Sequence, residues 1–351
     1  MGGVLIWVVK TLGERNLLYL CSVEENVLMK AAILFLKDWT LPTAIMTGAV
    51  LYFIFALVPE LDGFATQVSP IFDAVLPWFL FVILFVTFCK IDFRKMRPSK
   101  WHLWASVSQV LLVLGVVGCI LYFDIQGPNR ILLECVVTCI IVPCAAASAV
   151  VTMKLGGSLE SMTAHTFLSN IVTAIMIPLI FPLLEQHMSG GFLDTFLMIL
   201  GKVCMILVVP MGLACVVRHF LPRLQHWIVS IDDLGFYLWG CSLTIVSGIT
   251  FRNIMNAGTT VEFLALIALV SFVLCIIQFA LGRNIGHFFG ATIECGQALG
   301  QKNTAFAIWV ASAYLNPLSS VGPGCYILWQ NLVNSLELWQ HRRVEHRHAH
   351  A

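Results

Sequence analysis

Charged side chains are scarce in this chain of 351 residues. They make up 11% of it, whereas a soluble domain carries about 25%. Hydrophobic residues make up 59%, and the mean hydropathy is +0.89. This composition excludes an ordinary soluble domain and predicts a protein that crosses the lipid bilayer several times. A net charge of +1 without a basic stripe gives no reason to expect nucleic acid as a partner.

The N-terminus lacks the pattern of a cleavable signal peptide. Lys10, Glu14 and Arg15 follow the first short apolar run, and no small-residue cleavage site comes after it. Residues 1–35 are mixed apolar and charged, which predicts an interfacial segment. The twelve cysteines fall mostly inside apolar stretches, so we interpret them as small packing residues and not as a disulfide framework.

Ten apolar stretches are long enough to cross a bilayer, which takes about 20 residues. We therefore predict an all-α polytopic membrane protein, with a ten-helix transporter domain over 36–340 and a cytoplasmic tail over 341–351. The predicted spans are residues 40–57, 72–89, 103–123, 131–153, 161–184, 192–217, 227–249, 261–282, 291–314 and 321–338.

The fourth and ninth spans are interrupted, by 143–148 and by 300–303. A broken backbone inside a membrane leaves unpaired amides and carbonyls, which are tolerated only where they line a polar cavity or a binding site. Gln109 lies in the span before the first break, and Gln278 lies in the span before the second. These echoes support a division into two inverted five-helix repeats, about 36–185 and 190–340, each with one broken helix, helix 4 or helix 9.

Basic residues gather on one side of these spans, which orients the chain by the positive-inside rule. We expect both termini in the cytoplasm and the protein in the inner or plasma membrane. On the opposite side only Arg130 and Arg252 occur. The basic residues of the second connection and of the tail are Lys90, Arg94, Lys95, Arg97, Lys100, Arg342, Arg343 and Arg347.

Polar residues inside the fourth and fifth spans are candidates for a site. Pro143 removes a backbone donor, and Ser148 offers a hydroxyl among small residues. Thr166, Asn170 and Thr173 follow at i, i+4 and i+7, which places them on one helix face. Such a stripe must face protein or water. It serves either a ligand or bonding between helices.

Lys302 lies in the middle of the ninth span, between Gln301 and Asn303. An ammonium at this depth costs at least about 2.5–3.5 kcal/mol to insert. It needs an anion, a cluster of carbonyl groups, or the loss of its proton. A structural tether is the alternative to a functional role. Lys202, in the sixth span, ranks lower because no break or polar stripe surrounds it.

Taken together, four segments resemble the bile acid:sodium symporter family. The resemblance implies a panel domain and a core domain whose relative movement carries organic anions, such as bile acids or other carboxylates and sulfonates. The segments that carry it are 81–92, 143–152, 166–182, and 300–303 with Pro317, 322–324 and 329–331.

The resemblance also implies two sodium sites at the crossing of the broken helices. One resembles Ser148, Thr166 and Asn170. The other lies near Gln109 and the ninth-span motif that contains Gln301, Lys302 and Asn303.

This chain departs from the family at three of these positions. Ala149 stands where the family usually has Asn, Ala298 where it has Glu, and Lys302 where it has Gln. A second register places Glu294 at the acidic position but loses the Gln-Asn pair. We favour the first register because the following segment continues to match.

A lysine at a sodium site changes the expected coupling. Two unit charges about 4 Å apart repel by about 4 kcal/mol even at an effective dielectric constant of 20. Sodium and a protonated Lys302 should therefore not coexist. Our hypothesis is that the ammonium replaces sodium, either permanently or as a titrating proton carrier, and we expect no other cofactor.

Three other classes were weighed against an organic-anion transporter. A cation/proton antiporter normally needs aspartate at the crossing, and the fourth, fifth and ninth spans have none. An enzyme needs a nucleophile–base pair or metal-ligand spacing, which these spans lack. A non-transporting receptor stays open, as do the particular substrate and the oligomeric state.

Overall fold

The computed structural model describes residues 40–349, except 92–95, 185–190, 232–233 and 257. The predicted interfacial segment 1–35 lies outside the described residues. Within the described ranges the secondary structure is helical, with one isolated antiparallel bridge. The all-α prediction is confirmed for this part of the chain.

Helices occupy each of the predicted spans. In chain order they are α3 (Thr40–Leu57), α4 (Asp62–Cys89), α5 (Lys100–Tyr122), α6 (Pro128–Ile141), α7 (Ser148–Lys154), α8 (Leu159–Leu184), α9 (Phe192–Leu207), α10 (Val209–Phe220), α11 (Pro222–Ser230), α12 (Leu234–Asn256), α13 (Val261–Phe289), α14 (Thr292–Gly300), α15 (Thr304–Tyr314) and α16 (Val321–Ala349), with the short 3₁₀ helices η1 (Pro59–Leu61) and η3 (Pro317–Ser320).

Five helical stretches in the described part of the chain are long and apolar enough to cross a membrane. The chain is therefore an integral membrane protein. Shorter apolar helices, Pro42–Leu57 and Thr304–Tyr314, accompany them. The five stretches are Pro70–Cys89, Lys100–Tyr122, Leu159–Leu184, Phe192–Phe220 and Val261–Phe289.

One predicted boundary was wrong. The span 227–249 is not one helix, because α11 ends at Ser230, Ile231 is extended and α12 begins at Leu234. The span 192–217 falls within the apolar stretch Phe192–Phe220, in which the helix is interrupted at Val208 because Pro210 has no N–H to bond the carbonyl of Ile206. Helix α16 continues beyond the predicted span 321–338 to Ala349, since no Gly or Pro after residue 324 interrupts it.

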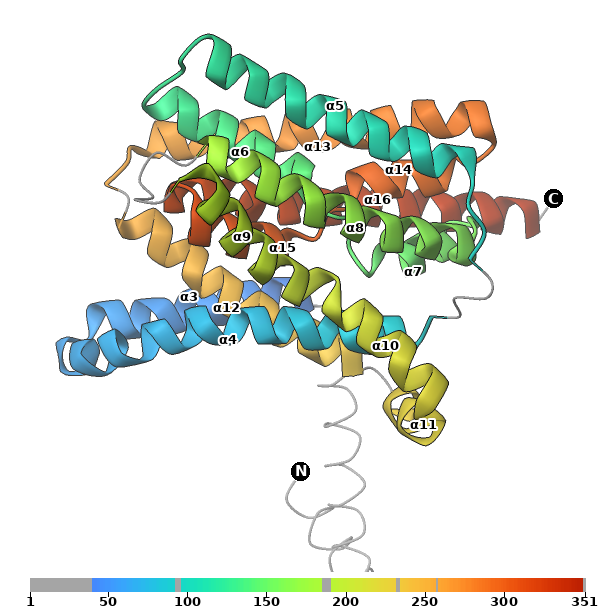
Figure 1. The fold of residues 1–351 in the computed structure, drawn as a ribbon, viewed down its shortest axis with the longest axis horizontal. Coiled ribbons are helices and arrows are strands. Elements are labelled where there is room, and N and C mark those ends of the chain that lie inside the picture. The colour runs from blue at the N-terminus through green and yellow to red at the C-terminus, as the bar shows by residue number, and fades with distance from the viewer. Residues whose placement is uncertain (1–39, 92–95, 185–190, 232–233, 257, 350–351) are drawn as a thin grey trace, which may run out of the picture.

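The helices pack as two groups (Figure 1). We call α3, α4, α9, α10 and α12 the panel group, because α3 and α4 pack against α12 and α10 packs against α4. We call α5–α8 and α13–α16 the core group, in which α13 packs against α14 and α16. The long segment α9–α10 begins against α8 of the core group and ends beside α4.

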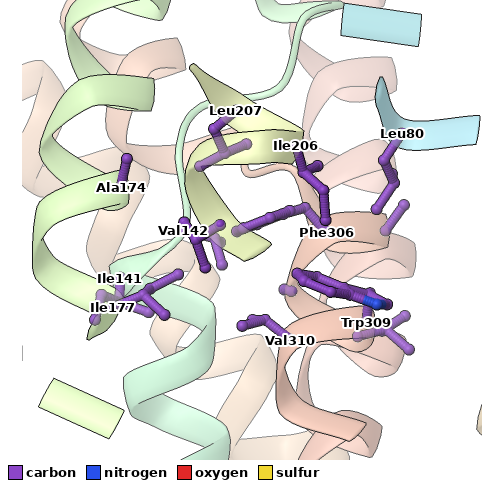
Figure 2. Close-up of a cluster of buried hydrophobic side chains, with 14 of the residues drawn as sticks. Leu80, Ile141, Val142, Ala174, Ile177, Ile206, Leu207, Phe306, Trp309 and Val310 are labelled. Atoms are coloured by element: carbon purple, nitrogen blue, oxygen red, sulfur yellow. The ribbon is translucent and has the colours of Figure 1, made fainter. Parts of the chain in front are cut away.

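An apolar cluster joins the two groups (Figure 2). Aromatic side chains of α15 occupy its centre, and α4 and α9 close it from the panel group. The end of α6 contributes Ile141 and Val142, so the first break rests on this cluster. The labelled members are Leu80, Ile141, Val142, Ala174, Ile177, Ile206, Leu207, Phe306, Trp309 and Val310.

Local sequence explains where the two broken helices stop. Val142 is extended (φ −71°, ψ 154°), as a residue before proline should be, so α6 ends at Ile141. Gln301 is also extended (φ −96°, ψ 99°), which ends α14 at Gly300. The side chain of Asn303 then accepts a bond from the amide of Phe306 at 3.3 Å and caps α15.

Candidate functional site: the crossing of the broken helices

The two breaks pair with each other in an antiparallel arrangement. The amide of Ala145 donates to the carbonyl of Gln301, and the amide of Asn303 donates to the carbonyl of Pro143, both at 2.9 Å. Between these bonds Cys144 faces Lys302. Backbone groups that one break frees are thus bonded by the other, a mutual pairing that the sequence did not predict.

Gln330 of α16 fixes the backbone of Lys302. Its Oε1 accepts from the Lys302 amide at 2.8 Å, and its Nε2 donates to the Lys302 carbonyl at 3.2 Å. Both polar groups of one residue are therefore held by one buried amide side chain. This clamp orients the lysine side chain toward α6.

The ammonium of Lys302 lies at the carboxyl end of α6. Its Nζ donates to the carbonyl of Ile140 at 3.1 Å and to that of Val142 at 3.4 Å. The side chain is 1% exposed, and no described carboxylate pairs with it. The negative end of the helix dipole and free carbonyls stabilise a cation here. The sequence left three ways to accommodate this ammonium, and the structure shows one of them, a cluster of carbonyl groups.

Two more side chains complete the cap on α6. Gln109 of α5 donates to the carbonyls of Ile141 at 3.0 Å and Val142 at 3.2 Å. The hydroxyl of Thr173 donates to Ile141 at 2.8 Å. All three carbonyls from Ile140 to Val142 therefore accept side-chain donors.

The polar stripe of α8 points at the first break. The Cys144 thiol lies 3.3 Å from the hydroxyl of Thr166 and 3.2 Å from that of Ser169. Ser169 also accepts the Cys144 amide at 3.3 Å. Asn170 donates to the carbonyl of Thr166 at 2.7 Å, and its Oδ1 has no partner among the described residues. The predicted shared face is confirmed.

The remaining predicted residues lie at the ends of the breaks. Ser148 is buried at the start of α7, where its hydroxyl donates to the carbonyl of Ala145 at 2.5 Å. Gln301 is buried, and its Oε1 has no partner in the described part of the chain. Asn303 serves as the helix cap described above.

The second break is also capped by a glutamine, but through an intermediate side chain. Gln278 of α13 donates to the hydroxyl of Tyr326 at 3.0 Å, and Tyr326 donates to the carbonyl of Gly300 at 2.8 Å. Gln109 reaches the first break directly, whereas Gln278 reaches the second through this tyrosine. The sequence placed each glutamine in the span before a break, but it predicted neither these contacts nor the intermediate tyrosine.

Sequence reasoning also missed Gln330, Ser169 and Cys144 as members of the site. Ser169 lies three residues after Thr166, so helical spacing alone gave a usable signal. Gln330 is one of several polar residues of α16, with Asn331 and Asn334 close by, and its contact with Lys302 depends on the tertiary packing of α16.

The structure also places the two alternative acidic positions. Glu294 lies in the first turn of α14, two turns before the break, and accepts the amide of Ser158 at 2.7 Å. Ala298 is 1% exposed and shares an apolar cluster with Cys144 and Ala149. Of the two positions, Ala298 is the one nearer the second break, two residues before the end of α14.

Crossed broken helices, in a chain that is apolar and helical over its described residues, are typical of a membrane transporter. Residues 77–285 match the Sodium Bile acid symporter family, and the chain belongs to that family. This match ends before the second break. A relative from Bacillus subtilis (strain 168), named uncharacterized sodium-dependent transporter YocS, is 22% identical over 267 residues, which are 74% of this chain and 80% of that protein.

The residues at the crossing fit sodium poorly. Ala149 and Ala298 offer no side-chain oxygen, and the Lys302 ammonium is bonded to carbonyls at the end of α6. The two unpartnered oxygens, on Asn170 and Gln301, are too few to replace a hydration shell.

Proposed function

We propose that this protein is a secondary transporter of small organic anions, either bile-acid-like or other carboxylates and sulfonates. Membership of the symporter family supports a transporter. Two groups of helices that meet at an apolar cluster offer surfaces that can move against each other. Transport would proceed by alternating access, with the core group moving relative to the panel group.

The proposed topology has ten spans in two inverted repeats of five. Each broken pair, α6–α7 and α14–α15, would count as one span. The backbone pairing of the breaks and the glutamine that serves each break support a repeat. With the basic connections inside, both termini lie in the cytoplasm of a cell whose inner or plasma membrane holds the protein.

The Lys302 ammonium takes the place of a coupling sodium ion in this proposal. One observation carries it: Nζ bonds the carbonyls of Ile140 and Val142 where a free cation would otherwise bind. The loss of both oxygen-bearing side chains, at Ala149 and Ala298, agrees with it. Transport is then driven by the substrate gradient or by protons.

The test is uptake of radiolabelled taurocholate and of a carboxylate panel into proteoliposomes. Equal initial rates in sodium, potassium and choline media are expected. Strong stimulation by sodium would refute the replacement by lysine. Lys302→Gln removes the charge and is expected to abolish uptake. Uptake by this variant at the wild-type rate would show that the lysine has only a structural role.

Two other functions give different outcomes in the same vesicles. A cation/proton antiporter would acidify or alkalinise the lumen when a cation gradient is imposed, although α6, α8, α14 and α15 contain no aspartate. A receptor would bind anions tightly without any uptake. Thermal-shift measurements on the purified protein, run beside the flux assay, separate these cases.

A further inference from the structure

An organic anion in a membrane site needs a cationic partner, and Lys302 is not available for this role. Its ammonium is buried and donates to two carbonyl groups. Arg130 pairs with Glu134, and Arg283 pairs with Glu337. The intramembrane lysine that is exposed is Lys202 of α9.

Lys202 lies within Phe192–Phe220, a stretch long and apolar enough to cross a membrane. It comes ten residues after Phe192, the first residue of α9, which is about 15 Å along the helix. Its Nζ lies 5.8 Å from the centre of the Tyr314 ring, so the side chain is directed at the core group. No described carboxylate forms a salt bridge with it. A membrane-embedded ammonium of this kind marks a functional site.

Tyr314 supplies a second donor at the same place. It is the last residue of α15 and is 5% exposed, yet its hydroxyl has no hydrogen-bond partner among the described residues. A buried hydroxyl without a partner is unfavourable, so an occupant that accepts a hydrogen bond from it stabilises the site. An anion does so, and its charge also attracts the adjacent ammonium.

The surroundings suit an amphipathic anion. Met198 and Met205 lie on the same face of α9 as Lys202, one turn to either side, and both are exposed. Methionine adapts to apolar ligands of varied shape. On the core side, Trp309 contacts the Tyr314 ring edge-on, with 5.9 Å between centroids. Apolar contacts thus flank a pair of donors.

We propose that Lys202 and Tyr314 form the headgroup subsite for a carboxylate or sulfonate, with an apolar body against Met198, Met205 and Trp309. This inference rests on the proposed function and names its substrate-binding residues. The two donors belong to opposite groups, since α9 is in the panel group and α15 in the core group. A bound anion bridges them, and movement of one group against the other loosens its hold.

Uptake of radiolabelled cholate by reconstituted variants tests the subsite. Lys202→Met should raise KM by about 10–100-fold, the value of a hydrogen bond to a charged group, and Tyr314→Phe should raise it by about 5-fold. Lys202→Arg should recover most of the affinity. Lys154→Met, which removes an exposed lysine on α7, is the matched control and should behave as the wild type.

A neutral competitor separates charge recognition from a structural effect. Cholate methyl ester should inhibit the wild type and Lys202→Met equally, whereas unlabelled cholate should lose potency only against the variant. An unchanged cholate KM in folded Lys202→Met overturns this subsite and leaves the transporter proposal intact. Absence of cholate uptake by the wild type counts against the transporter proposal. In that case the thermal shift that cholate induces still decides the subsite, because this shift is expected to vanish in Lys202→Met.

Discussion

Gln109 and Lys302 donate to the same acceptor, the carbonyl oxygen of Val142, at 3.2 and 3.4 Å. One reaches it from α5 and the other from the second break. The end of α6 is therefore held by side chains from two distant parts of the chain. An amide and an ammonium thus supply the donors to this end of α6 at the crossing.

Restoring the family residues should restore sodium dependence. The double variant Ala298→Glu/Lys302→Gln replaces an internal cation with a carboxylate beside the same carbonyls, so a sodium ion gains a counter-charge and oxygen ligands. Uptake should become at least about tenfold faster in sodium than in choline, which corresponds to about 1.4 kcal/mol. Lys302→Gln alone is the control. A folded double variant whose uptake ignores sodium would contradict the assignment.

Gln109→Leu should destabilise the protein modestly. It removes donors from the carbonyls of Ile141 and Val142, but Thr173 and Lys302 still bond these groups. The expected loss is about 1 kcal/mol, typical of a hydrogen bond between membrane helices. Thermal unfolding in detergent measures it. Gln126→Leu, in the exposed loop before α6, should show no comparable loss.

Gly282→Ala should disrupt the packing of α13 on α14. A Cβ at Gly282 would lie 2.2 Å from the carbonyl oxygen of Cys295 and 2.9 Å from the Cα of Gly296, so backbone must move. We expect a loss of about 1–3 kcal/mol in unfolding free energy. Gly118→Ala in α5 meets nothing within 4 Å, and should be neutral or stabilising by about 0.5–1 kcal/mol. Similar melting temperatures for both variants would show that α14 shifts easily.

The two breaks could be predicted because their causes are local. Pro143 forces Val142 into an extended conformation, and an apolar span that contains Lys302 and Asn303 is unusual enough to mark the second break. That the breaks meet was implied by the resemblance to the symporter family. The polar stripe of α8 followed from helical spacing.

The partners of Lys302 could not be predicted, because backbone carbonyls leave no trace in the sequence. Whether the ammonium would meet an acid or carbonyls depended on how α6 and the second break are placed. The error at 227–249 has a different cause. The apolar run extends through Ile231, and hydropathy does not distinguish one helix from two that meet at an extended residue.

The ion pair of Arg130 and Glu134 gives a prediction about non-additivity. Their side chains are 3.1 Å apart and nearly buried, and Glu134 also accepts the hydroxyl of Ser319 at 2.7 Å. Glu134→Leu leaves a nearly buried guanidinium without its charged partner, although it still donates to the carbonyl of Leu184, and should cost about 3 kcal/mol. Arg130→Leu/Glu134→Leu should cost clearly less than the sum of the single variants. Additive losses in thermal unfolding would show that the two charges act independently.

Asn253 offers a test of movement between the two groups. Its Nδ2 lies 3.0 Å from the hydroxyl of Ser312, 2.9 Å from that of Ser320 and 3.3 Å from the carbonyl of Pro317, so α12 of the panel group is bonded to α15 and η3 of the core group. Alternating access requires these bonds to break. Asn253→Ala should therefore raise deuterium uptake several-fold over residues 312–320, measured by hydrogen exchange in detergent or nanodiscs.

Asn256→Ala, which changes an exposed residue one turn further along α12, is the control and should leave deuterium uptake over residues 312–320 unchanged. Equal exchange in both variants would mean that the contact stays closed without Asn253, and that the groups are held together at this end by their apolar packing.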